Sequence, residues 1–251
     1  MKERIAPVKN LARLQELLES LKLRSSRLPG VGVVYGETGV GKSTGLTWAA
    51  VRENAAYVRA LRVWSPSSML DTICEELDIE ASRNLARTLR AIVNELSAQN
   101  RMLILDEADY LVEKRSLLDT LRDLHDLSAM PLILVGMGDF VKKLKSRIDQ
   151  KQFNGRIAFE CAFQPLDADD TQRVVKDLSE VTIEDDLVAK LHAAAGGSIR
   201  LVCVGIERIE RHAKHRGLKA IGSKAWGDKP LNIYETVDRP TRIAHDTTAA
   251  A

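Results

Sequence analysis

Five short apolar runs are spread over residues 31–163, and longer segments with helical periodicity separate them. The runs read VGVVYG, AAYVRAL, RMLILDE, PLILVGM and RIAFECAF. Strand-like runs that alternate with helical segments are typical of a parallel sheet covered by helices. The pattern therefore predicts an α/β fold with a five-stranded parallel sheet.

A well-defined helical segment between these runs is RSLLDTLRDLHDLSA, residues 115–129. Apolar residues that recur at intervals of three or four lie on one face of a helix. Five leucines are expected on that face: Leu117, Leu118, Leu121, Leu124 and Leu127. The segment is therefore predicted to form an amphipathic helix.

Three helical segments follow Pro165, and the strand-like runs stop there. Acidic residues near the starts of the first two segments suit the positive end of a helix dipole. The segments span residues 167–180, 182–197 and 198–216. We therefore expect an α/β domain over residues 1–165 and a small all-helical domain over residues 166–216. The periodicity then fades, and residues 217–251 are expected to form an irregular tail.

Composition and charge set limits on the class of protein. The formal net charge of +2 excludes a whole-molecule polycation, so any basic surface must be local. The three cysteines, Cys74, Cys161 and Cys203, are far apart, which argues against a zinc site or a disulfide framework. The N-terminal segment lacks the apolar core of a signal peptide, and no run reaches membrane-spanning length. We expect a cytoplasmic protein without a membrane partner, in the bacterial host cytoplasm if a phage encodes it.

The first apolar run leads into GETGVGKST, residues 36–44, which is a phosphate-loop motif. Glycines let the backbone N–H groups face nucleotide phosphates, Lys42 can reach the β and γ oxygens, and the Ser43 hydroxyl can bind Mg²⁺. The motif follows a predicted strand and opens a predicted helix, as this function requires. The expected ATP-binding residues are Gly36, Glu37, Thr38, Gly39, Val40, Gly41, Lys42, Ser43 and Thr44.

An acidic pair ends the third apolar run, where open α/β sheets bind their ligands. Asp106 is expected to hold Mg²⁺, directly or through water, together with Ser43. Glu107 is expected to orient and deprotonate the attacking water. An acidic pair at a strand end is by itself more often only solvated, but the phosphate loop favours catalysis. ATP and Mg²⁺ are therefore the expected cofactors.

These motifs together resemble those of AAA+ ATPases. The GGSIR segment, Gly196 to Arg200, resembles the sensor-2 motif of the lid domain, which implies that Arg200 reaches the γ-phosphate. The alternative is a glycine helix end followed by a serine N-cap, with a solvated Arg200. The fourth run departs from the family because Asp139 is the first polar side chain after it. The absence of an earlier polar sensor-1 residue suggests slow basal hydrolysis.

The NGRIAFECAF segment resembles the part of AAA+ proteins that carries the arginine finger. The resemblance implies that Arg156 acts in trans, in the nucleotide site of a neighbouring subunit, where it stabilises transition-state charge. Arg147 is the rival for this role, and an ordinary surface arginine is the other alternative.

Within AAA+ proteins, residues 5–215 resemble the phage Mu B-type target-selection ATPases of DNA transposition. The compact core, the ILDEADYL strand and the short lid ending in GGSIRLV carry this resemblance, and secretion-associated and replication-initiator ATPases share these features. It implies an ATPase that forms a homo-oligomeric filament or ring on duplex DNA without sequence specificity and delivers that DNA to a transposase. The alternative is an AAA+ ATPase that remodels or regulates a protein partner and has no DNA affinity of its own.

DNA contacts in such an assembly would come from basic loops that touch the phosphate backbone. Lys114 and Arg115 follow the acidic pair, and Arg59 and Arg62 flank the end of the second strand. The basic stretch ERIERHAKHRGLKAIGSK at the end of the lid is another possible contact. Each of these charges can equally be a solvated surface residue.

Overall fold

The computed structural model describes residues 1–25, 27–146 and 151–232. The chain divides into two compact units. The α/β unit comprises Pro7–Leu166 together with Ser198–Arg200. The helical unit comprises Met1–Ala6, Asp167–Gly197 and the chain from Leu201 onward.

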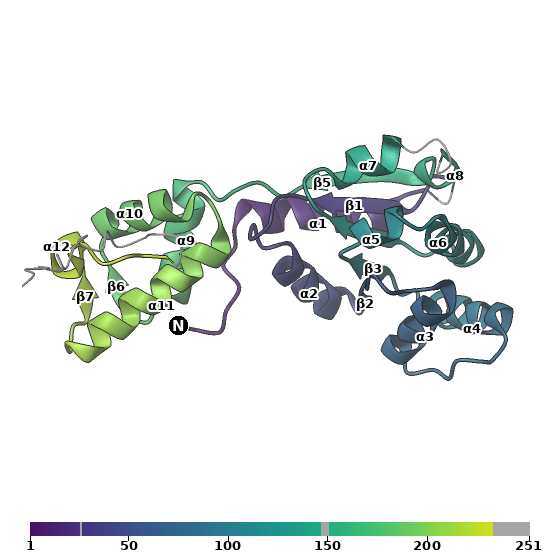
Figure 1. The fold of residues 1–251 in the computed structure, drawn as a ribbon, viewed down its shortest axis with the longest axis horizontal. Helices are drawn as coiled ribbons and strands as arrows, with labels where there is room; N and C mark the ends of the chain where they lie inside the picture. The colour runs from purple at the N-terminus through teal and green to yellow at the C-terminus, as the bar shows by residue number, and fades with distance from the viewer. Residues whose placement is uncertain (26, 147–150, 233–251) are drawn as a thin grey trace, which may run out of the picture. The chain divides into compact units, whose positions relative to one another are not determined.

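The α/β unit is built on a five-stranded parallel sheet, which confirms the predicted fold class (Figure 1). The strand order is β2-β3-β4-β1-β5. Each strand corresponds to one of the five apolar runs: β1 (Val31–Tyr35), β2 (Ala56–Arg59), β3 (Leu103–Asp106), β4 (Leu132–Gly136) and β5 (Ile157–Ala162).

The sequence of each strand reflects its place in the sheet. The central strands β3 and β4 are buried at every position, and they read as continuous apolar runs. Strands covered on both faces have this composition. The edge strands β2 and β5 instead alternate buried and more exposed residues.

Helices cover both faces of the sheet. Ile104 of β3 packs with α1 (Lys9–Leu23) and α2 (Lys42–Glu53). Its neighbours Leu103 and Leu105 pack on the other face, because successive side chains of a strand point to opposite sides. That second face is covered by α3 (Pro66–Leu77), α4 (Leu85–Ala98), α5 (Asp109–Val112), α6 (Arg115–Ser128), α7 (Phe140–Ser146) and α8 (Lys151–Asn154).

The helix α6 differs in one position from the predicted leucine face. Leu117, Leu118, Leu121 and Leu124 are buried as expected, but Leu127 is 62% exposed. Nine residues after Leu118, Leu127 lies about 180° from it around the helix at 100° per residue, outside the buried stripe. His125 occupies the buried position instead, and its Nδ1 lies 2.8 Å from the Met130 carbonyl oxygen.

The helical unit contains the three expected helices: α9 (Ala168–Leu178), α10 (Asp185–Ala195) and α11 (Ile199–His215). The first two residues of α11 belong to the α/β unit. The unit is not purely helical, because β6 (Thr182–Ile183) and β7 (Ala220–Ile221) pair in parallel. Such two-residue strands are too short to leave a periodic pattern in the sequence.

The start of the expected irregular tail is ordered in the structure. After Gly217, the chain forms β7 and the short helix α12 (Ser223–Trp226), and it buries Trp226 and Leu231. Residues 233–251 lie outside the described part of the chain. No helix among the described residues is both long and apolar enough to cross a membrane.

Candidate active site

The phosphate loop connects the C-terminal end of β1 to the first turn of α2. Gly39 and Gly41 adopt φ angles of +85° and +94°, which L side chains rarely adopt. These two residues let the loop curl before the helix begins, as the motif predicts. The N-terminus of α2 favours an anion at this point, because its free N–H groups and dipole point out of the helix.

Lys42 lies at the centre of the loop. Its Nζ donates to the carbonyl oxygens of Gly36 at 2.6 Å and Glu37 at 2.9 Å. Burial lowers the pKa of Lys42, while the nearby carboxylates of Asp106 and Asp109 act in the opposite direction. The ammonium group is therefore held between the phosphate loop and the acidic end of β3.

Asp106 ends β3 and is only 4% exposed. Its Oδ2 accepts a hydrogen bond of 2.6 Å from the Tyr57 hydroxyl, and its Oδ1 accepts one of 2.8 Å from the Glu107 N–H. A carboxylate and the Ser43 hydroxyl at the start of α2 form an oxygen donor set that suits Mg²⁺. These residues fit the predicted metal.

Tyr57 was missed by the sequence analysis. Its position in the edge strand β2 pairs with Ile104 of β3, two residues before Asp106. Burial and the hydrogen bond to Asp106 raise the pKa of Tyr57, so the hydroxyl keeps its proton and donates at neutral pH. The only sequence signal was a tyrosine inside the second apolar run, AAYVRAL.

Glu107 has an unusual backbone conformation, with a φ of +56°. The other described non-glycine residues with positive φ lie at the ends of helices: Asn54, Asp78, Asn100 and Ala129. Glu107 instead directly follows a strand, and its side chain forms an ion pair with Arg59 of β2. The residue predicted as the catalytic base is thus bound to a residue predicted as a DNA contact.

Asp109 connects the acidic segment to the end of β4. Its Oδ2 accepts a hydrogen bond of 2.9 Å from the Met137 N–H, and its Oδ1 is buried without a partner among the described residues. Burial raises the pKa of Asp109. Asp139, the first polar side chain after β4, instead pairs with Lys143 at 2.9 Å and is more than half exposed.

Residues 198–200 lie at the phosphate loop within the α/β unit. The Arg200 N–H donates to the Gly39 carbonyl oxygen at 3.2 Å, and the Ser198 hydroxyl donates to the same oxygen at 3.4 Å. Gly196 caps the preceding helix in the left-handed conformation, as in the helix-end alternative. The backbone of the predicted sensor-2 segment therefore meets the phosphate loop, while the Arg200 side chain is exposed.

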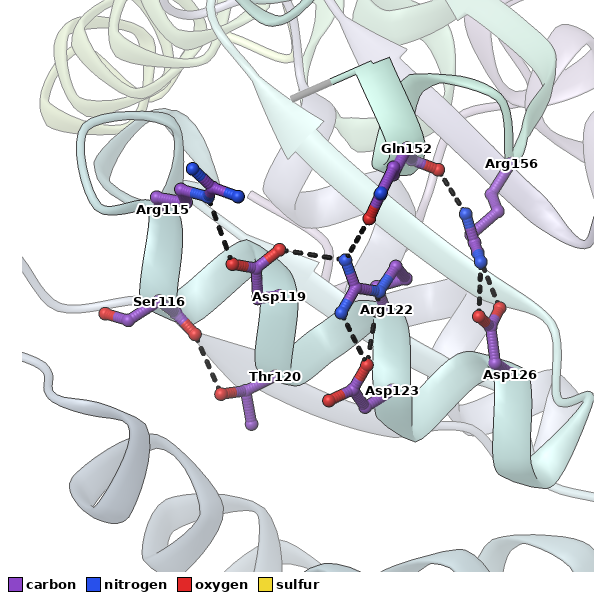
Figure 2. Close-up of polar contacts among 9 residues, drawn as sticks. All are labelled: Arg115, Ser116, Asp119, Thr120, Arg122, Asp123, Asp126, Gln152 and Arg156. Carbon is purple, nitrogen blue, oxygen red and sulfur yellow. Dashed lines mark hydrogen bonds and ion pairs between the residues drawn. The ribbon is translucent and has the colours of Figure 1, made fainter. Parts of the chain in front are cut away.

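Arg156 is engaged elsewhere in its own chain. Figure 2 shows its guanidinium group against the Asp126 carboxylate of α6, with a further hydrogen bond to the Gln152 carbonyl oxygen. None of its hydrogen bonds or ion pairs within the described residues is with the phosphate loop. Arg147, the rival finger, lies outside the described residues.

The residues predicted to contact DNA differ in whether their charged groups already have partners within the chain. Lys114 donates to the Arg62 carbonyl oxygen at 2.8 Å and to the Trp64 carbonyl oxygen at 2.7 Å, so it shapes the loop after β2. Arg115 pairs with Asp119 on the exposed side of α6 (Figure 2). Arg62 is exposed and forms no ion pair with any described residue.

A second group of free cations, which the sequence analysis missed, lies around the start of α4. Arg83, Arg87 and Arg90 are exposed, and none of them forms an ion pair within residues 1–25, 27–146 and 151–232. The opposite face of α4 buries Thr88 and Ile92. The signal was the three-residue spacing of Arg87 and Arg90, which puts these two on one side of the helix.

Comparison with known proteins agrees with this geometry. Residues 25–144 match the AAA domain family. No curated protein matches the chain. Among solved structures, the Aeropyrum pernix ORC2 protein, in ADPNP-ADP complexes, has a TM-score of 0.69 at 18% identity, with 90% of this chain and 68% of that chain covered.

Two further structures are similar. The Aeropyrum pernix ORC1 protein in complex with DNA has a TM-score of 0.60 at 19% identity, and 89% of this chain and 64% of that chain are covered. Thermotoga maritima RuvB has a TM-score of 0.61 at 17% identity, with 88% and 67% covered. The chain therefore spans about two thirds of the length of these structures.

At these identities the structural likeness establishes the fold alone, and it gives no support to the narrower Mu B-type resemblance. The family match and the strand order of the sheet agree with each other. Residues 25–144 thus match the AAA domain family, and the chain has the AAA+ P-loop NTPase fold.

Proposed function

We propose that this protein is an ATPase that binds duplex DNA without sequence specificity in an ATP-dependent homo-oligomer. The observation that carries the proposal is the Lys42 ammonium group bound to the phosphate loop, with the carboxylate of Asp106 nearby. A cation, a helix N-terminus and a carboxylate that suits a metal are thus available together. A nucleotide polyphosphate with its Mg²⁺ is the ligand that uses all three.

Each residue then has a defined part in hydrolysis. Lys42 binds the β and γ oxygens, and Ser43 and Asp106 hold the metal. Bound Mg²⁺ supplies neutralisation of the charge that develops on the β and γ oxygens. Glu107 orients the attacking water and accepts its proton, which requires that its ion pair with Arg59 opens.

DNA binding is supported by the free arginines of the α/β unit. Arg62, Arg83, Arg87 and Arg90 are exposed without ion pairs within the described chain. Guanidinium groups bind phosphate oxygens and read no sequence unless they reach base edges. One subunit offers few such contacts, so assembly of several subunits on one duplex is needed for tight binding.

Delivery of the bound DNA to a transposase is supported by the sequence resemblance alone. The alternative, an ATPase acting on a protein partner, is favoured by one observation on the loop after β2. Leu61 and Val63 on either side of Arg62 are 49% and 84% exposed. Exposed apolar side chains at a loop tip suit a protein surface better than a phosphate backbone.

Filter binding of mixed-sequence duplex, with and without ATP, distinguishes these functions. The proposal expects retention that needs ATP, is similar for unrelated sequences and falls steeply with salt. Retention equal to that of a protein-free blank at low salt, with ATP present, would reject DNA binding and leave the protein-partner alternative. Adding purified transposase to preformed complexes then tests whether the DNA is passed on.

A further inference from the structure

The carboxyl group of Asp106 is buried and held by hydrogen bonds rather than by an ion pair. It is 4% exposed and forms no ion pair with another described residue. The Tyr57 hydroxyl bonds one oxygen at 2.6 Å and the Glu107 N–H bonds the other at 2.8 Å. Each oxygen keeps a second lone pair, so both bonds can persist while the carboxylate binds a metal or its water.

Tyr57 also lies near the helix that follows the phosphate loop. The Thr47 side chain is close enough to the Tyr57 hydroxyl to act on its pKa, in the direction that lowers it. Thr47 lies one turn after Ser43 in α2, and Asp106 ends β3. The hydroxyl that binds Asp106 therefore lies near the helix that carries Ser43, the other proposed metal-binding residue.

We propose that Tyr57 is a positioning residue that fixes the Asp106 carboxylate for binding of the divalent cation that accompanies ATP. The inference rests on the proposed function, because it concerns the metal of that same site. Without the hydroxyl, one lone pair of a buried carboxylate loses its donor, and of the two hydrogen bonds only the one from the Glu107 N–H still restrains the group. The metal then has to order the carboxylate on binding, which lowers its affinity.

Replacement of Tyr57 by phenylalanine (Tyr57→Phe) tests this directly, since it removes one oxygen and keeps the ring. The measurement is the binding of a fluorescent ATP analogue, first without divalent metal and then titrated with Mg²⁺. We expect the affinity for the ATP analogue without metal to be unchanged. The Mg²⁺ concentration that gives half of the metal-dependent change in binding should rise on the order of tenfold, the usual size of effect when a metal-binding side chain loses its hydrogen-bond partner. Turnover at saturating Mg²⁺ should recover most of its wild-type value.

Tyr35→Phe is the matched control. Tyr35 lies in β1, is partly buried against the core, and its hydroxyl has no hydrogen bond within the described residues. Its Mg²⁺ titration should match that of the wild type. Equal half-saturation for the wild type and Tyr57→Phe would overturn the inference while leaving nucleotide binding intact.

Two further outcomes are informative. A wild-type protein that binds no ATP analogue at any Mg²⁺ concentration would overturn the proposed function and this inference with it. A Tyr57→Phe protein that melts before the titration temperature would move the titration to a lower temperature, at which the variant is folded. An Mg²⁺ requirement equal to that of the wild type at that temperature would reject the role of Tyr57.

Discussion

Arg59 and Glu107 form an ion pair between the C-terminal end of β2 and the residue that follows β3. The Arg59 side chain is 65% exposed and the Glu107 side chain is 38% exposed. Pairs with this degree of exposure contribute little to stability, because solvent screens them. The pair therefore restrains the proposed base weakly enough for ATP or a DNA phosphate to open it.

Removing this restraint should speed the basal reaction. We expect Arg59→Ala to raise ATP turnover without DNA by up to about fivefold, because a solvent-screened ion pair holds Glu107 only weakly. Phosphate release at saturating ATP is the measurement, and Arg62→Ala, a neighbouring arginine without an ion pair, is the control. A slower Arg59→Ala enzyme would show that the arginine assists Glu107 rather than restrains it.

Glu107→Gln should bind ATP and Mg²⁺ normally but lose turnover by about 10² to 10⁴-fold, because an amide cannot accept the proton of the attacking water. Single-turnover hydrolysis and equilibrium ATP binding separate the two effects. The exposed Glu113, changed to glutamine, controls for loss of a carboxylate in the same region. Turnover within tenfold of the wild type would place the base at another residue.

Lys42→Ala should weaken ATP binding by about a hundredfold or more, because the phosphates lose a charge-assisted hydrogen-bond donor. Isothermal titration with ATP and Mg²⁺ measures the affinity, and Lys142→Ala, an exposed lysine of α7, provides the control. Wild-type affinity in the Lys42 variant would mean that the loop does not hold the phosphates.

A finger role for Arg156 can be separated from its ion pair with Asp126. If Arg156 acts in trans, Arg156→Ala should bind ATP but fail to hydrolyse it in the assembly, whereas Asp126→Asn should retain turnover. Mixing Arg156→Ala with Glu107→Gln should restore some activity, since a mixed interface can join an intact arginine to an intact base. The melting temperature could instead fall by the same amount in both single variants while neither loses turnover. Arg156 would then only stabilise the packing of β5 and α8 against α6 (Figure 2).

The free arginines of α4 should matter to DNA and not to ATP. Arg87→Ala with Arg90→Ala should weaken binding of all duplex sequences alike and reduce the logarithmic salt slope by about 1.8, or about 0.9 for each lost phosphate contact. Arg173→Ala with Lys176→Ala, exposed cations of α9 without ion pairs among the described residues, removes the same charge elsewhere. Equal losses in both double variants would indicate a general charge effect rather than a DNA-binding face.

Motifs with a fixed local geometry could be predicted from the sequence, and contacts between distant elements could not. The phosphate loop and the acidic end of β3 follow from glycines, apolar runs and charges that are adjacent along the chain. The bond from Tyr57 to Asp106 joins residues 49 positions apart and depends on the register of β2 and β3. That register is set by tertiary packing, which a single sequence does not display.

The partners of the charged residues also could not be predicted from the sequence. Lys114 and Arg115 are adjacent and equally basic in sequence, yet one donates to backbone carbonyl groups and the other to a carboxylate one turn along α6. Whether a surface cation is free depends on the loop that folds next to it. The sequence therefore identified where positive charge lies, and the structure was needed to find which cations are unpaired.

At Glu107, the left-handed backbone conformation lowers the stability of the fold, while the carboxylate at the same position is proposed to serve turnover. A side chain in that conformation costs about 1 kcal/mol or more, and glycine would remove most of the cost. A screen that selected variants only for a higher melting temperature should therefore enrich Glu107→Gly, and the winners should be inactive. Retention of glutamate at this position would be a sign of selection for chemistry and not for folding.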